Sequence, residues 1–144
     1  MTDSKKRIIR LILFSIYILI VLRLTIFRFN SILDERVLNL TLFVDLIHVY
    51  QNAGLRLFLW LFLGNIGWFV PFGFLLPMLL KKESFLKSVG IGFLFSLVIE
   101  SLQFAFRLGV AELDDLILNT LGVVIGYLLF KHVYERLPVR WRVI

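Results

Sequence analysis

Four long apolar stretches run along the chain and are separated by short, more polar segments. They cover residues 8–27, 55–80, 86–106 and 116–133. About 20 helical residues cross the hydrocarbon core of a bilayer, and in lipid only helices and closed barrels satisfy their own backbone polar groups. A barrel would need many alternating strands of about ten residues. The pattern therefore predicts one all-α domain over residues 1–144, an integral membrane bundle of four transmembrane helices.

The second apolar stretch carries two prolines, Pro71 and Pro77. A proline inside a helix has no N–H to donate to the carbonyl four residues earlier. We therefore expect a broken or kinked helix, with freed carbonyls that neighbouring helices or water must satisfy.

The segment 28–54, between the first two stretches, is too apolar for a plain linker. Its apolar positions follow a patchy helical period: Val37, Leu38, Leu40, Leu42, Phe43, Leu46, Ile47 and Tyr50. This pattern predicts an apolar segment or helix that lies in the membrane interface or dips into the bilayer.

Composition supports a membrane protein and excludes two other classes. Of the residues, 60% are hydrophobic and 18% are charged, whereas an ordinary soluble domain is roughly 45–50% apolar. A soluble domain of this size has too little interior to hide so much apolar surface, so a soluble globular domain and a disordered tail are both excluded. There is no cysteine, which excludes disulfides and thiolate metal sites.

The distribution of Lys and Arg predicts the orientation. Eleven of the sixteen basic residues fall on the side that holds the two chain ends and the segment 81–87, four fall on the other side, and Arg23 lies inside the first stretch. Cytoplasmic loops carry the excess of Lys and Arg, so both termini are expected in the cytoplasm. The net charge of +6 then reflects these loops and anionic lipid headgroups, and no nucleic-acid partner is expected.

The third stretch carries the most unusual polar residues. Glu100, Gln103 and Arg107 are spaced i, i+3, i+7, which places them on one helical face. A carboxylate inside the membrane is costly and needs a partner or water. One interpretation is a Glu–Arg pair that locks two helices together, with Arg107 or Arg23 as the cation. The other is a polar pocket that opens outward.

The fourth stretch opens with Asp114 and Asp115. Acidic residues in a first turn can simply stabilise the positive end of the helix dipole. Asp115 also shares a stripe with Asn119, Gly122 and Gly126. The glycines predict close packing against another helix, whereas Asn119 could serve equally as a hydrogen-bonding contact between helices or as a ligand.

Other chemistry has little support in the sequence. Asn65, in the second stretch, is expected to face the acidic site. His48 and His132 are far apart and lack the spacing of a metal site. There is no phosphate-binding loop and no catalytic-triad pattern. We expect neither a metal nor a cofactor.

Three blocks resemble the VanZ-like family of bacterial membrane proteins. They are residues 65–77, residues 96–103 followed by Arg107, and residues 113–122 followed by Gly126 and Tyr127. A weaker block, residues 39–43, is similar to the family's Asn-Leu-x-Pro-Phe, with Leu42 in place of the usual proline. Glu112 stands where an Asp is common in the family.

The resemblance implies a multi-pass protein of the bacterial cell membrane. The founding member of the family is associated with resistance to teicoplanin, and members have been proposed to act on lipid headgroups or on undecaprenyl-linked cell-wall intermediates. A site in the outer leaflet would suit such partners. Glu100, Asp115 and Asp114 are then the candidate catalytic residues, and Arg107, Gln103, Asn119 and Asn65 are the candidate substrate-binding residues. Arg107 would hold phosphate, and Glu100 or Asp115 would transfer a proton.

Two other functions stay open on the sequence alone. A non-catalytic membrane protein could scaffold a partner or shield a surface target. A small transporter subunit would need polar residues that continue to the cytoplasmic side, and below Glu100 the third stretch offers only Ser96 and two glycines. The sequence decides neither whether the protein is an enzyme nor whether it forms a homo-oligomer.

Overall fold

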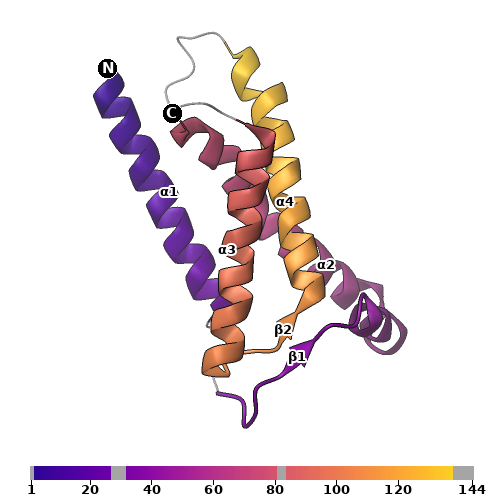
Figure 1. Ribbon diagram of the computed structural model, residues 1–144. Coiled ribbons are helices and arrows are strands. Elements are labelled where there is room, and N and C mark those ends of the chain that lie inside the picture. Colours follow the sequence, from indigo (N-terminus) through magenta and orange to yellow (C-terminus); the bar gives the residue numbers. More distant parts are fainter. Residues whose placement is uncertain (1, 27–31, 81–83, 138–144) are drawn as a thin grey trace.

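Four membrane-length helices make up most of the chain in a computed structural model, which describes residues 2–26, 32–80 and 84–137 (Figure 1). The helices are α1 (Asp3–Ile26), α2 (Val44–Leu79), α3 (Phe85–Phe106) and α4 (Leu113–His132), followed by a short 3-10 turn, η1 (Tyr134–Arg136). All four helices are long and apolar enough to cross a membrane. The predicted all-α, four-span fold is confirmed, and the protein is a multi-pass membrane protein. Phe27, predicted to end the first span, and Lys81, Lys82, Arg28, Arg140 and Arg142, used for orientation, lie outside the described residues.

The second helix is interrupted at a glycine rather than at its prolines. Gly54 has φ 82° and ψ 172°, outside the helical region, whereas Pro71 and Pro77 lie within helical backbone. Of the predicted broken or kinked helix, the break at the prolines was therefore wrong. Glycine adopts positive φ without the clash that a Cβ would cause, so Gly54 is where the chain can change direction. The part of α2 after Gly54 matches the predicted span 55–80.

The segment before α2 is only partly helical. Helix begins at Val44, whereas Leu38 and Asn39 form a two-residue strand, β1, that pairs in parallel with β2 (Ala111–Glu112). The helical period predicted for residues 37–42 was therefore wrong, because this part of the chain is extended beside the α3–α4 connection. Two further backbone bonds hold it there: Leu33 N–H donates to Arg107 O (2.8 Å) and Ala111 N–H to Val37 O (3.0 Å). In Figure 1 this strand pair lies at the end of the bundle opposite the start of α1.

Close packing of α4 against α2 depends on glycine. A Cβ added to Gly122 would lie 2.2 Å from the carbonyl oxygen of Ile66, and one added to Gly126 would lie 2.0 Å from that of Val70. The predicted close contact at the glycine stripe is confirmed. Small residues are common where membrane helices approach each other this closely.

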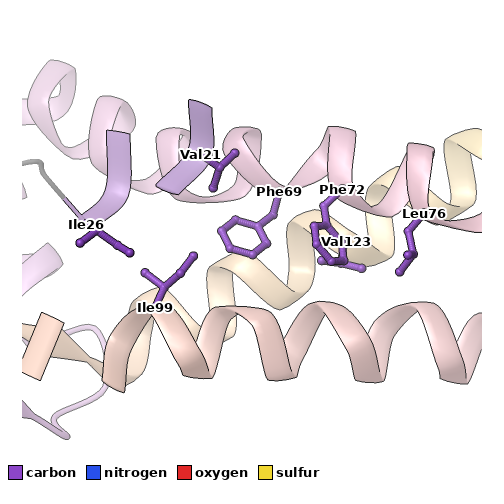
Figure 2. Close-up of a cluster of buried hydrophobic side chains, with 7 residues drawn as sticks. All are labelled: Val21, Ile26, Phe69, Phe72, Leu76, Ile99 and Val123. Carbon is purple, nitrogen blue, oxygen red and sulfur yellow. The ribbon is translucent and has the colours of Figure 1, made fainter. Parts of the chain in front are cut away.

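All four helices contribute to one apolar core. Figure 2 shows its fully or nearly buried side chains, which are Val21 and Ile26 of α1, Phe69, Phe72 and Leu76 of α2, Ile99 of α3 and Val123 of α4. The Phe72 ring also stacks on Phe95 at a centroid distance of 5.1 Å. Most of α1 stays exposed, since only 6% of its most apolar window is buried. Such a surface suits contact with lipid.

Candidate functional site

A cavity of about 1050 Å³ lies among the four helices, on the side of the core where β1 and β2 pair. Its lining comes from the end of α1, the first half of α2 after the Gly54 break, the end of α3 and the start of α4. Five of the seven predicted site residues line it: Asn65, Glu100, Gln103, Asp115 and Asn119. The helix packing therefore brings together polar side chains from three different helices.

The two carboxylates in the cavity lining are held by donors from other parts of the chain. Glu100 is 7% exposed, and its Oε2 accepts the backbone N–H of Glu112 at 2.9 Å. The Asp115 carboxylate accepts a hydrogen bond from Asn65 Nδ2. Glu100 thus ties α3 to β2, and Asp115 ties α4 to α2.

The amide side chains also have structural partners. Gln103 Nε2 donates to the carbonyl oxygen of Thr25 at 3.1 Å, and Asn119 Nδ2 donates to Ser96 Oγ at 2.9 Å. Asn119 therefore connects helices and lines the cavity, so both of its expected roles fit its position. Gln103 Oε1 is buried and has no hydrogen-bond partner among the described residues.

Arg107, predicted to hold phosphate, lies outside the cavity lining. It ends α3 in the left-handed conformation (φ 58°), and its backbone N–H caps the helix by donating to Gln103 O and Phe104 O. Its Nη1 donates to the backbone oxygen of Asp34 at 3.1 Å. In this structure Arg107 therefore organises the turn after α3 and the segment that leads to β1.

Asp114, predicted as a catalytic residue, also lies outside the lining. It is 3% exposed, and both carboxylate oxygens lie 2.9 Å from the backbone nitrogen of Phe43. Phe43 has φ 57° and precedes the first residue of α2. Asp114 therefore holds the unusual backbone at the start of α2 against α4.

We predict that Asp114→Ala loosens this contact. A buried N–H left without an acceptor costs about 1–3 kcal/mol, so the melting temperature in detergent should fall and cleavage by protease within residues 32–43 should rise. Asp45→Ala is the matched control, because that carboxylate is exposed and accepts only a local bond, from Asn39 Nδ2 (2.5 Å). Equal melting temperatures for the two variants would contradict the assigned role.

Sequence reasoning missed the polar and aromatic residues that the first half of α2 adds to the cavity. They are Arg56, Trp60 and Trp68, which line the same cavity as Asn65. Arg56 makes no hydrogen bond or ion pair with any residue that the structure describes. Helical spacing gave no signal for Arg56 or Trp60: steps of three and four residues back from Asn65 reach Leu61 or Phe62 and then residues 57–59.

Metal-binding side chains do not gather here. Over residues 2–26, 32–80 and 84–137, no group of three or more His, Asp or Glu side chains could hold a metal ion. The polar groups that line the cavity are side-chain carboxylates, amides and indoles, one threonine hydroxyl and one guanidinium.

The fold and the cavity together define a small four-helix membrane protein with a partly polar cavity inside the bundle. The model of the VanZ/LLP1 family matches residues 14–134, so the chain belongs to that family. No curated protein and no solved structure matches the chain.

Proposed function

We propose that this VanZ/LLP1 family member binds a membrane lipid in the cavity, with the headgroup at the polar residues. The observation that carries the proposal is the composition of the lining. Glu100, Gln103, Asp115 and Asn119 share one cavity with Leu, Trp and Gly side chains of α2. A ligand that fits both halves of such a lining is polar at one end and apolar at the other.

Exposure of the α2 wall supports access from the lipid phase. Trp60 is 75% exposed and Leu63 is 55% exposed, although both line the cavity. In a membrane-spanning helix these surfaces meet acyl chains. On the other side of the cavity, α1 contributes Leu24 and Thr25. A lipid could therefore place its headgroup among the polar residues while its chains lie along exposed apolar surface of α2.

The polar residues suggest how a phosphorylated headgroup would be held. Arg56 supplies a guanidinium, which binds phosphate through two parallel N–H donors. Gln103 and Asn119 would orient the headgroup. Glu100 and Asp115 are the groups that could act as general acid or base if the protein modifies the lipid. Phospholipids and undecaprenyl-linked cell-wall intermediates both combine a phosphorylated headgroup with apolar chains. A change in either kind of lipid could alter teicoplanin susceptibility.

Deletion of the gene tests the proposal most directly. We expect the total lipid profile, including lipid-linked cell-wall intermediates, or the teicoplanin susceptibility to differ between the deletion strain and the same strain complemented with the wild-type gene. The purified protein should also carry bound lipid, detectable by native mass spectrometry. Unchanged lipids and susceptibility, together with lipid-free purified protein, would overturn the proposal.

A comparison of two arginines tests the phosphate contact. We predict that Arg56→Gln weakens binding of a phosphate-bearing lipid by about tenfold, since charge-assisted bonds are the stronger hydrogen bonds. Arg107→Gln should change affinity less, because Arg107 lies outside the lining and bonds to Asp34 O. Lipid titration of both purified variants measures this. A larger loss for Arg107→Gln would instead support the phosphate role that the sequence predicted for Arg107.

A further inference from the structure

The charged and amide groups of the cavity lining offer mainly hydrogen-bond acceptors to a headgroup. The lining holds two carboxylates, those of Glu100 and Asp115, and one guanidinium, that of Arg56. A carboxylate only accepts hydrogen bonds when ionised. Each carboxylate also accepts a hydrogen bond from the protein, and when ionised each attracts a cationic headgroup.

The amides strengthen this bias, because the N–H groups with assigned partners donate into the protein. Asn65 donates to Asp115, Gln103 to the Thr25 carbonyl and Asn119 to Ser96. In each of these three amides, one N–H group is therefore already bonded to a residue of a neighbouring helix. The carbonyl ends of the amides are the ends for which a ligand could supply a donor.

Gln103 provides the most specific sign of a missing donor. The residue is 6% exposed and lines the cavity, and its Oε1 is buried without a partner among the described residues. Buried polar atoms are nearly always hydrogen-bonded. A donor brought by the ligand would satisfy this oxygen.

We propose that the cavity selects a phospholipid headgroup that carries a hydrogen-bond-donating ammonium group. This inference rests on the proposed function. The phosphate of such a headgroup meets Arg56, its positive charge lies near the carboxylates of Glu100 and Asp115, and one of its N–H groups donates to Gln103 Oε1. A quaternary ammonium has the same charge but no N–H, so it leaves Gln103 Oε1 unsatisfied. The inferred specificity therefore depends on the N–H donors and not on the positive charge alone.

A methylation series tests the inference with the full-length purified protein. The lipids share their acyl chains and are phosphatidylethanolamine, its N-methyl and N,N-dimethyl forms, and phosphatidylcholine, with phosphatidylglycerol as the source of hydroxyl donors. Binding is measured by titration in detergent. We expect similar affinities for the first three lipids and a drop of about tenfold or more at phosphatidylcholine, where the last N–H is lost.

Two variants connect the drop to the side chain. Gln103→Met keeps the length of the side chain and removes the acceptor, so the ratio of phosphatidylethanolamine to phosphatidylcholine affinity should fall severalfold. Ser101→Ala should leave the ratio unchanged, because Ser101 is exposed on the same helix and its Oγ bonds only to Leu97 O. Melting temperatures establish that both variants fold.

Four outcomes would overturn the inference. Equal affinities for phosphatidylethanolamine and phosphatidylcholine would show that N–H donors do not determine binding. An even decline in affinity along the series would show that the size of the headgroup determines it. Tighter binding of phosphatidylglycerol assigns the donor to a hydroxyl instead. An unchanged ratio in Gln103→Met removes the role of Gln103. If none of the lipids binds, the proposed function fails and this inference fails with it, a result distinct from the other four.

Discussion

A strain that carries Glu100→Ala is expected to match the deletion strain in lipid profile and teicoplanin susceptibility. Glu100 is nearly buried, lines the cavity and accepts the backbone N–H of Glu112 at 2.9 Å. Alanine removes the charge at the proposed headgroup site. It also leaves that N–H without its carboxylate acceptor, at a cost of about 1–3 kcal/mol in stability. Lipid analysis and susceptibility testing of complemented strains measure the functional loss.

Glu100→Gln separates these two effects. Its amide oxygen can still accept the Glu112 N–H, so the melting temperature in detergent should stay close to wild type. The negative charge is lost, so the function should be lost as completely as in Glu100→Ala. Ser101→Ala, on the exposed side of α3, is the control that should behave as wild type. Full function in a stable Glu100→Gln protein would limit Glu100 to holding α3 against β2.

The spans were predictable because apolar length is a local property of the sequence. Residues 86–106 of the prediction and α3 (Phe85–Phe106) differ by one residue at the start. The change in chain direction at Gly54 was harder to predict from the sequence. Prolines are the residues known to disturb a helix, but Pro71 and Pro77 sit in helical backbone, and the positive φ of Gly54 becomes visible only with the fold.

For the cavity residues, too, the sequence carries the local spacing, whereas the tertiary structure decides which side chains meet. The spacing of Glu100 and Gln103 placed them on one helical face, and the tertiary structure brings that face to Asp115 and Asn65. Asp114 could not be separated from Asp115 by sequence, since adjacent positions on a helix point about 100° apart and only packing decides which side faces the cavity. Asp114 turns to the backbone of Phe43 instead.

Arg56 is one of the four basic residues that the orientation analysis places on the side away from the chain ends, and its position at the start of an apolar stretch gives no sign of a cavity. Its contribution to the cavity depends on how α2 is rotated after the break. The pairing of β1 with β2 is even less local, since it joins Leu38 to Ala111. Two-residue strands carry almost no sequence signal, and contacts between such distant residues follow from the packed helices.

Gly126→Ala is expected to give the largest loss of stability. An added Cβ would lie 2.0 Å from the carbonyl oxygen of Val70 and 2.9 Å from the backbone nitrogen of Phe74. Backbone atoms cannot turn away as a side chain can, so α2 and α4 would have to separate. We expect a loss of about 3 kcal/mol, the upper end of the usual range for over-packing. Unfolding by denaturant in detergent, compared with wild type, measures it.

Two other glycines show whether the cost comes from the contact itself. Gly90→Ala meets no atom within 4 Å, so it should be neutral or raise stability by up to about 1 kcal/mol, as expected for Gly→Ala in a helix. Gly92→Ala would place its Cβ 2.5 Å from Val123 Cγ2, a side-chain atom. Combining it with Val123→Ala removes that atom, so Gly92→Ala should cost less in the Val123→Ala background than in wild type. The same background should not rescue Gly126→Ala, because the clash at Gly126 involves only the backbone of α2. Rescue there, or equal losses at all three glycines, would contradict backbone contact between α2 and α4 as the source of the loss.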